Sequence, residues 1–151
     1  HRNDVSALER LIEGGYVVDT MEVSAPWSRL EAIYQSATAA IAAVPGTIVA
    51  SAHQSHSYLD GGCLYFTFAG KPESADLDRF YLQAWEAGTT AVIEAGGSLS
   101  HHHGIGLNRS RFMARANPSS TELTQRIRRA LDPNDTCNPG KLGAANQLEL
   151  G

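Results

Sequence analysis

The stretch Gly62-Cys63-Leu64-Tyr65-Phe66-Thr67-Phe68 alternates between two kinds of side chain, and this alternation predicts how the chain folds around it. Successive side chains of a β-strand point to opposite faces of the sheet, so the stretch divides into two sets. The apolar set is Leu64, Phe66 and Phe68, and the mixed set is Cys63, Tyr65 and Thr67. We expect the apolar set to pack on helices, which turns Tyr65 toward the opposite face. On the residues alone, cross-strand packing is the simplest interpretation of Tyr65.

The segments before this stretch predict two further strands. Residues 46–58 form an extended run, which Leu59-Asp60 separate from the run 61–68, and this arrangement is typical of an antiparallel hairpin. Residues 16–23 are β-branched and mostly apolar, which favours a half-buried strand. A turn at Ser24-Ala25-Pro26-Trp27 is expected to follow that strand.

Four helices are predicted around the strands. They run from Asp4 to Gly14-Gly15, from Ser28 to Pro45-Gly46, from Ser74 to Gly96-Gly97, and from Pro118 to Asp132-Pro133. Two of them begin with the serine-to-glutamate spacing of a capping box, Ser28 with Glu31 and Ser119 with Glu122. Each carries apolar residues at helical spacing. The stripes include Tyr34 in the second helix, Leu77 to Ala95 in the third, and Leu123, Ile127, Ala130 and Leu131 in the last.

This order of elements predicts an α+β fold: an antiparallel sheet with helices on one face, ferredoxin-like, plus a C-terminal helix. The 151 residues, 42% of them hydrophobic, fit one domain over residues 1–142 with a loosely ordered tail at 143–151. The start at His1, with no initiator methionine, predicts a piece of a longer protein.

Charge and cysteine content exclude several classes of function. A net charge of −4 gives no basic surface suited to nucleic acid, and no apolar run approaches the roughly 18 residues of a membrane span. Cys63 and Cys137 do not make a disulfide framework, and Cys63 is expected to be buried as a small apolar side chain. We therefore expect a cytoplasmic protein.

The stretch Gly96-Gly97-Ser98-Leu99-Ser100-His101-His102-His103-Gly104-Ile105-Gly106 places three imidazoles between glycines. Glycine permits close approach of the main chain to a bound molecule, and histidine exchanges protons near neutrality. We predict proton transfer by His101, His102 and His103. Metal binding is a second interpretation, in which an extended segment would let at most His101 and His103 share an ion. A structural polar turn is a third.

Arginines and a rigid turn follow the histidines. Arg109, Arg111 and Arg115 could hold a phosphate or a carboxylate, because arginine presents a planar fork of donors to such anions. A solvated face is the alternative interpretation. Asn138-Pro139-Gly140-Lys141 is typical of a rigid turn.

Taken together, three of these motifs resemble the C-terminal half of FAD-linked oxidases of the vanillyl-alcohol oxidase type. They are the histidine stretch, Gly62 to Phe68, and Leu131-Asp132-Pro133-Asn134 with Asn138-Pro139-Gly140-Lys141. Within that superfamily the chain is most similar to the alkyldihydroxyacetonephosphate synthases, on Ser24-Ala25-Pro26-Trp27, Tyr65 and residues 96–104.

The resemblance implies a cap or substrate domain over FAD, with most of the cofactor held by a separate FAD-binding domain and no activity for this piece alone. It implies exchange of an acyl for an alkyl group on a flavin adduct, with acid and base steps by Tyr65 and the histidines 101–103. His53, His56 and Arg109 are the predicted substrate contacts, and Asn138 and Lys141 the predicted cofactor contacts. Expected partners are the FAD-binding domain, a small-molecule or lipid substrate and, as one option, a second copy of the chain.

A second branch of the superfamily oxidises 2-hydroxy acids, and many of its members use a metal-binding strand reading roughly His-x-Gly-Asp-Gly-Asn-Leu-His, followed by Gly-Glu-His-Gly. Here Tyr65 stands in place of the final histidine of that strand, and His102 in place of the glutamate. Losing a ligand and a charge weakens a divalent-metal site, so we favour the metal-free synthase type. An FAD-linked oxidase of an alcohol or a 2-hydroxy acid is the first alternative, and a non-enzymatic ferredoxin-like binding module is the second.

Overall fold

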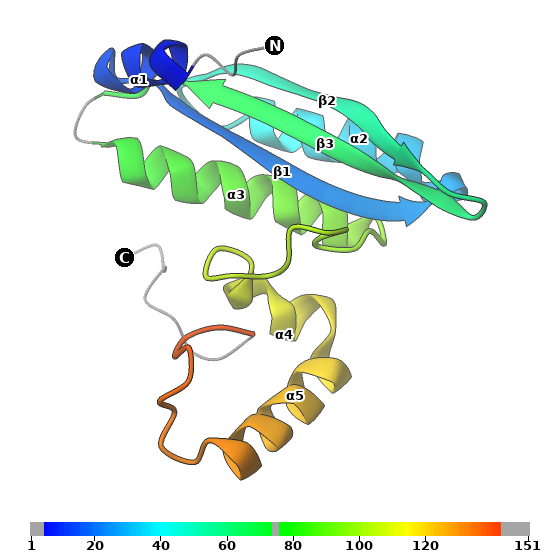
Figure 1. Cartoon of the computed structure of the whole chain (residues 1–151). Helices are drawn as coiled ribbons and strands as arrows, with labels where there is room; N and C mark the ends of the chain where they lie inside the picture. Colours follow the sequence, from blue (N-terminus) through cyan, green and yellow to red (C-terminus); the bar gives the residue numbers. More distant parts are fainter. Residues whose placement is uncertain (1–4, 74–75, 143–151) are drawn as a thin grey trace.

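The computed structural model describes residues 5–73 and 76–142, with side chains described from residue 9 onward. In chain order the elements are α1 (Val5–Glu13), β1 (Val17–Pro26), α2 (Trp27–Ala42), β2 (Thr47–Ser57), β3 (Gly61–Gly70), α3 (Leu77–Glu94), the 3-10 turn η2 (Ser110–Phe112), α4 (Met113–Ala116) and α5 (Pro118–Leu131). The sheet packs against α2 and α3, while α4 and α5 form a separate layer beyond α3 (Figure 1). The α+β prediction is confirmed.

The strands form one three-stranded sheet in the order β1-β3-β2, and both pairs are antiparallel. β3 is therefore the central strand, paired with β1 through Glu22 opposite Tyr65 and with β2 through His53 opposite Tyr65. The predicted hairpin of β2 and β3 is confirmed. It closes at Leu59-Asp60, where the Tyr58 amide donates to the Gly61 carbonyl at 2.8 Å.

The helix-facing side of the sheet is the hydrophobic core, as the alternation in β3 predicts. Phe66 and Phe68 are 1% and 0% exposed, and they pack with Met21 of β1 and with the inner faces of both long helices. The helical contributions to this core include Ile33, Ile41, Phe80, Trp85 and Val92. Burial of these side chains is the main source of the stability that holds the sheet on its helices.

Both capping-box predictions are wrong, because each helix begins before its serine. β1 continues through Pro26 and runs directly into α2 at Trp27, so the turn expected at residues 24–27 is absent. α5 begins at Pro118, the first-turn position that proline favours, with Asn117 before it. Neither helix has a side-chain cap, and Ser28 and Ser119 lie inside the first turn.

The start of α3 and the two ends of the chain are only partly described. Asp76 is the N-cap residue of α3, and the predicted cap Ser74 lies outside the described residues, as do Asp4 and the tail at 143–151. At the other end α3 stops at Glu94, and Gly96 follows with a φ of 80°, which confirms the predicted glycine stop. In the described part of the chain, no helix is long and apolar enough to cross a bilayer.

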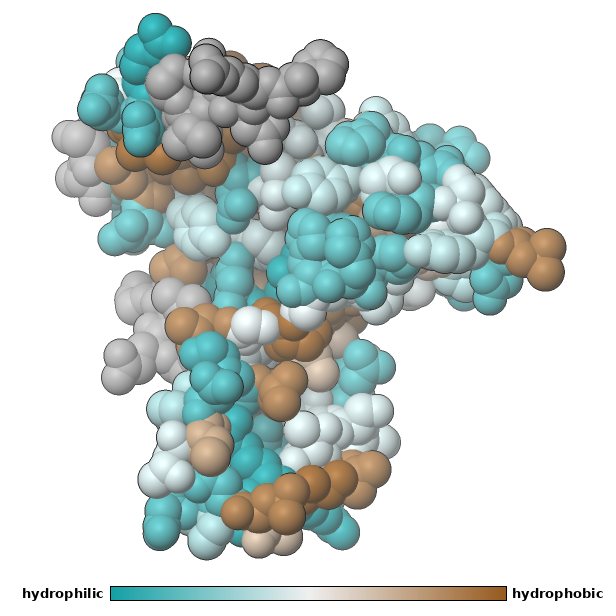
Figure 2. Space-filling view, in the orientation of Figure 1, coloured by the Kyte–Doolittle hydropathy of each residue, from teal (hydrophilic) through white to brown (hydrophobic). Residues whose placement is uncertain are grey.

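The apolar side predicted for α5 does not lie in a core. Leu123, Ile127 and Leu131 are 60%, 51% and 81% exposed, and Thr121 is the buried residue of this helix. Figure 2 shows apolar surface over α5. Tyr34, a member of the predicted apolar stripe of α2, is 42% exposed. In both helices the spacing marks an apolar stripe, but the core covers only part of the α2 stripe and none of the α5 stripe.

The position of the core predicts that one substitution lowers the free energy of unfolding strongly and that a control substitution hardly changes it. Phe68→Ala removes a fully buried ring from the central strand, and we expect the free energy of unfolding in urea to fall by about 3–5 kcal/mol. Leu59→Ala changes a fully exposed side chain at the hairpin tip and should stay within about 0.5 kcal/mol of the native chain. Equal effects of the two substitutions would contradict the assignment of this face as the core.

Candidate active site

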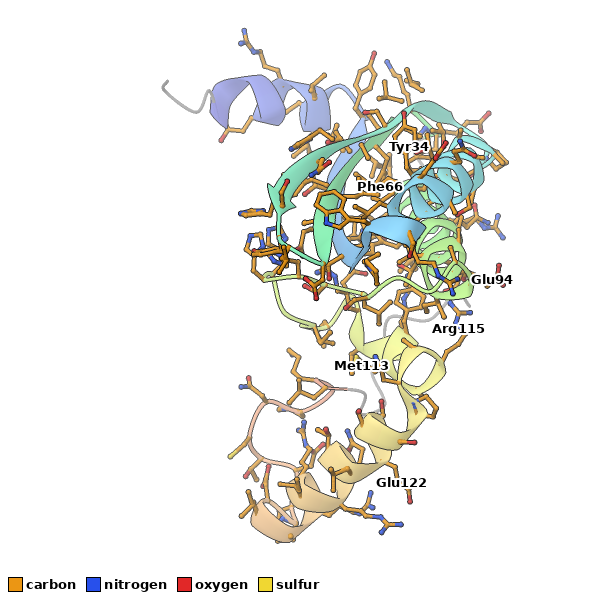
Figure 3. All side chains as sticks on the ribbon, turned by 90° about the vertical axis from the view of Figure 1, so that its right-hand side faces the viewer. Tyr34, Phe66, Glu94, Met113, Arg115 and Glu122 are labelled. Carbon is orange, nitrogen blue, oxygen red and sulfur yellow. The ribbon has the colours of Figure 1, made fainter. Side chains whose placement is uncertain are left out.

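The sheet face opposite the helices is polar across all three strands. Residues paired directly across antiparallel strands share a face, so the register assigns each side chain. The set comprises Thr20, Glu22 and Ser24 of β1, Cys63, Tyr65 and Thr67 of β3, and Ser51, His53 and His56 of β2. Figure 2 shows a largely hydrophilic surface over the sheet, and Figure 3 shows nitrogen-bearing rings gathered on the side away from α2 and α3.

The histidine stretch reaches this face because it hydrogen-bonds to the edge of the sheet. The Ser98 amide donates to the Ser24 carbonyl at 2.8 Å, which forms an isolated antiparallel bridge to β1. The chain then bends at residues 101–103 instead of continuing extended. This bend brings all three imidazoles over the polar face.

Glu22 is the point on which the histidine stretch is fixed. Its carboxylate is 0% exposed. Oε2 accepts hydrogen bonds from the Ser100 hydroxyl and the His101 amide, each at 3.0 Å, and Oε1 accepts one from the His102 amide, also at 3.0 Å. The Cys63 thiol adds a weaker contact to Oε1 at 3.5 Å.

These hydrogen bonds decide the ionisation of Glu22. Burial opposes the charged form by desolvation, but the donors at His101, Ser100, His102 and Cys63 together outweigh it and lower the pKa of Glu22 to about 2. Burial and the nearby carboxylate both raise the pKa of the Cys63 thiol. Glu22 is therefore a buried carboxylate and Cys63 a neutral thiol. Cys63 is 0% exposed, which confirms its expected burial.

The imidazoles of the stretch lie close to one another and to Glu22. Nδ1 of His101 and Nδ1 of His102 are 2.8 Å apart, and they lie 3.3 and 3.2 Å from Oε1 of Glu22. The rings of His102 and His103 are 4.5 Å apart between centroids. The expectation that only His101 and His103 could share an ion is wrong, because the bend puts the neighbouring rings of His101 and His102 on one side.

Tyr65 joins the same cluster from the central strand. Its ring centroid lies 5.6 Å from that of His103 and 5.4 Å from that of His53. The Thr20 hydroxyl donates to the Tyr65 phenol oxygen at 3.1 Å. The structure thus places Tyr65 on the polar face, as predicted.

His56 completes the cluster from β2. Its ring lies 5.1 Å from His101 and 5.2 Å from His102. Of the predicted site residues, the structure brings together Tyr65, His53, His56 and the three histidines 101–103. Groups that exchange protons therefore line one continuous surface.

Sets of potential metal ligands lie within this cluster. Among the described residues, ligand atoms lie within 4.8 Å of one another in three sets: His56, His101 and His102; Glu22, His102 and His103; Glu22, Cys63 and His101. The two sets with Glu22 are poor ligand sets, because its oxygens already accept hydrogen bonds from main-chain and side-chain donors. The all-histidine set keeps ring nitrogens for an ion.

Arg109 lies beneath the histidine stretch, 8% exposed. Its Nε donates to the Leu99 carbonyl at 2.9 Å, and its guanidinium lies 5.0 Å from the centre of the Trp85 ring. Burial lowers the pKa of Arg109, while the charges of Glu22 and Asp19 act in the opposite direction. These contacts fasten the stretch to α3, and a substrate contact by Arg109 remains a prediction.

The other two arginines fasten the following segment to the same helix. Arg111 donates to the Leu82 carbonyl at 3.3 Å, and Arg115 donates to Glu86 and Thr90. Arg111 is partly buried and has a packing role, whereas Arg115 is exposed and pairs with the Glu86 carboxylate on the surface, as the solvated-face alternative describes.

The predicted cofactor residues lie elsewhere, in the turn after α5. The carbonyls of Asn138 and Lys141 accept hydrogen bonds from the Arg128 guanidinium at 2.9 and 3.2 Å. Both residues line a mostly apolar cavity of about 630 Å³ beside Ile127 and Leu131. Their contact with a cofactor remains a prediction.

Two residues of the site were missed by sequence analysis, Glu22 and Thr20. A signal was present, because both are polar residues within the apolar run 16–23 and lie two residues apart, which places them on one face of a strand. The residues of this run do not reveal the strand register, which places Glu22 opposite Tyr65.

An α+β domain with one polar, histidine-rich sheet face is suited to proton transfer at a bound substrate. The family model of FAD linked oxidases, C-terminal domain, matches residues 1–142, and the chain belongs to this family. Because the family consists of enzymes, the alternative of a non-enzymatic binding module is set aside.

Several known proteins are similar to the chain. An alkyldihydroxyacetonephosphate synthase of Dictyostelium discoideum is 34% identical over 140 residues, covering 87% of this chain and 22% of that protein. The uncharacterized FAD-linked oxidoreductase YgcU of Escherichia coli (strain K12) is 30% identical over 150 residues, covering 92% of this chain and 31% of that protein.

A solved structure of an alkyldihydroxyacetonephosphate synthase shares the fold, with a TM-score of 0.55 and 24% identity over 88% of this chain and 21% of that chain. The chain thus spans less than a third of the length of each protein compared.

The ionisation of Glu22 predicts how stability depends on pH. The pKa in the fold, about 2, lies below the ordinary 4.5, so the stabilisation is fully present above about pH 5 and is lost as the pH falls toward 2. The difference corresponds to about 3 kcal/mol. Urea unfolding between about pH 6 and pH 2.5 should show this loss in the native chain and in the control Glu94→Gln, and much less of it in Glu22→Gln. Parallel pH profiles for all three chains would contradict the assignment.

Proposed function

We propose that this chain is the substrate-facing domain of a flavoenzyme of the alkyldihydroxyacetonephosphate synthase type, which exchanges the acyl group of an acyl-dihydroxyacetone phosphate for an alkyl group. The observation that carries the proposal is the cluster of Tyr65 with the three consecutive imidazoles on the polar sheet face. The similarity to the Dictyostelium discoideum synthase over 87% of the chain supports it.

The exchange needs groups that move protons at the substrate, and the cluster supplies them. A proton must leave the carbon that bears the acyl group, and the departing carboxylate must be assisted. His102 and His103 are exposed and Tyr65 is half-buried, so these three side chains can reach a molecule lying on the face. His101 is less exposed and lies against Tyr58 and His56.

The donor set fits a flavin enzyme, because the cofactor carries the difficult chemistry and phenol and imidazole groups can hold and move protons beside it. FAD, when bound, would supply an electron-poor ring system for an exchange that involves no net redox change. We infer that the FAD-binding domain of the parent enzyme faces this sheet surface and that Asn138 and Lys141 contact the cofactor. His53 and His56, exposed on β2, and the buried Arg109 are the inferred substrate contacts.

We also propose a cellular compartment for the enzyme. Both Cys63 and Cys137 are free, which supports a reducing compartment such as the cytoplasm. A second copy of the chain remains the option for an oligomeric partner.

A second candidate is an FAD-linked oxidase or dehydrogenase acting on an alcohol or a 2-hydroxy acid. The observation that favours it is the set His56, His101 and His102, whose ring nitrogens lie close enough to share a divalent ion that would polarise a hydroxyl group. The similarity to the FAD-linked oxidoreductase YgcU supports this alternative.

Anaerobic mixing of the flavin-loaded parent enzyme with substrates separates the two candidates. We expect acyl-dihydroxyacetone phosphate and a fatty alcohol to yield free fatty acid with no electron acceptor consumed. Tyr65→Phe should lower kcat by about 100-fold or more, because a proton-transfer group is lost. Tyr34→Phe, on α2 and away from the cluster, is the matched control and should react as the native enzyme does.

The opposite result would be bleaching of the flavin by a 2-hydroxy acid, with electrons passed to an acceptor and no reaction of the acyl substrate. That outcome would replace the synthase proposal with the oxidase or dehydrogenase.

A further inference from the structure

Glu22 is buried in a way that general packing does not explain. A carboxylate removed from water costs several kcal/mol, and this one meets donors on main-chain amides, a hydroxyl and a thiol, with the Nδ1 atoms of two imidazoles close by. All of the hydrogen-bond donors except Cys63 belong to the histidine stretch, residues 100–102. The carboxylate therefore holds the histidine stretch in place more than it stabilises the sheet.

The short distances between the two Nδ1 atoms and from each of them to Oε1 restrict where the imidazole protons lie. Two Nδ1 atoms 2.8 Å apart can be in contact only if one carries a proton and the other does not, because two donors or two lone pairs would repel. Oε1 of Glu22, 3.2 to 3.3 Å from both, is an acceptor that favours a proton on the Nδ1 side of the pair. One ring is then protonated at Nδ1 and its neighbour at Nε2.

We propose that Glu22 is a positioning residue that holds His101 and His102 as a complementary pair, one ring exposing a basic Nε2 and the other an acidic Nε2–H. In each ring the two nitrogens point in diverging directions. With both Nδ1 atoms turned to Glu22, both Nε2 atoms point away from it. This inference rests on the proposed function, in which these rings transfer protons.

Such a pair can move one proton across the site without any net change in charge. The ring with the free Nε2 takes the proton that leaves the substrate carbon and passes its Nδ1 proton across the 2.8 Å contact. The neighbouring ring accepts that proton at Nδ1 and releases its own Nε2 proton to the departing carboxylate. One C–H bond is broken, one O–H bond is formed, and the two tautomers are exchanged.

The pair also explains why the site needs adjacent histidines. A single imidazole would have to turn over to take a proton on one side and release it on another, whereas two rings joined through Nδ1 offer two Nε2 atoms in fixed places. The three hydrogen bonds from Ser100, His101 and His102 to one carboxylate fix the main chain that carries both rings.

The direct test is the tautomeric state of the two rings. In the chain labelled with ¹⁵N-histidine, long-range ¹H–¹⁵N spectra near pH 8 distinguish a ring protonated at Nδ1 from one protonated at Nε2. We expect one of His101 and His102 in each state. Finding both rings in the same tautomer would overturn the proposal.

Glu22→Gln removes the charge at nearly constant size and should abolish the complementary pattern, leaving the two rings alike. The matched control is Glu94→Gln, which removes a carboxylate at the end of α3, on the helix side of the molecule (Figure 3). It should leave the pattern unchanged. An unchanged pattern in Glu22→Gln, with circular dichroism showing a folded chain, would also overturn the proposal.

A kinetic measurement in the flavin-loaded parent enzyme separates positioning from a structural role. We expect Glu22→Gln to lower kcat by about 100-fold with little change in KM for the acyl substrate, because the rings lose their alignment while the substrate contacts remain. A rise in KM as large as the fall in kcat would indicate a structural role and count against the proposal. If the native enzyme does not act on the acyl substrate, the proposed function fails, and the tautomer spectrum still decides whether Glu22 pairs the rings.

Discussion

The hydrogen bonds between the Glu22 carboxylate and the histidine stretch are the interaction on which the site depends. Glu22 belongs to β1, whereas the stretch follows α3, so one buried side chain joins two segments about 80 residues apart in the chain. Burial raises the energy of the charge, and the donors around it lower that energy again. The result is a fixed point over which the imidazoles converge.

The two faces of the sheet have different roles in the domain. One face is an apolar core shared with α2 and α3, and it keeps β3 rigid, so that Tyr65 has a fixed place on the other face. Buried Arg109 anchors the main chain at Leu99, just before the histidines. A polar cluster on such a rigid support can hold proton-transfer groups at fixed separations, which is what acid and base steps require.

Much of the fold could be predicted because it follows from local patterns. The period-two alternation of residues 62–68 identified the core face, and the paired extended runs identified the hairpin. The capping boxes failed for a physical reason: a serine three residues before a glutamate forms a box only as the N-cap residue, and here Pro26 and Asn117 hold that position. The exposed stripe of α5 shows that periodicity gives an apolar face but not what lies against it.

The site could be predicted only in part. The histidines and Tyr65 were recognisable by residue type, but their meeting depends on the register of β1 against β3 and on the bend at residues 101–103. Neither the strand register nor the bend can be predicted from a local sequence pattern. Glu22 was missed for the same reason, because an acidic residue in a strand usually faces solvent, and only the histidine stretch covering it makes this one buried.

The central claim is that Glu22 is an ionised anchor held by the histidine stretch. The most direct measurement is an NMR titration of its ¹³C-labelled side-chain carboxyl in the folded chain. The account predicts that the carboxyl signal stays in its ionised position down to about pH 3 and titrates with a pKa of about 2. A titration near the ordinary value of 4.5 would show that the carboxylate is not held by these donors, and would contradict the account.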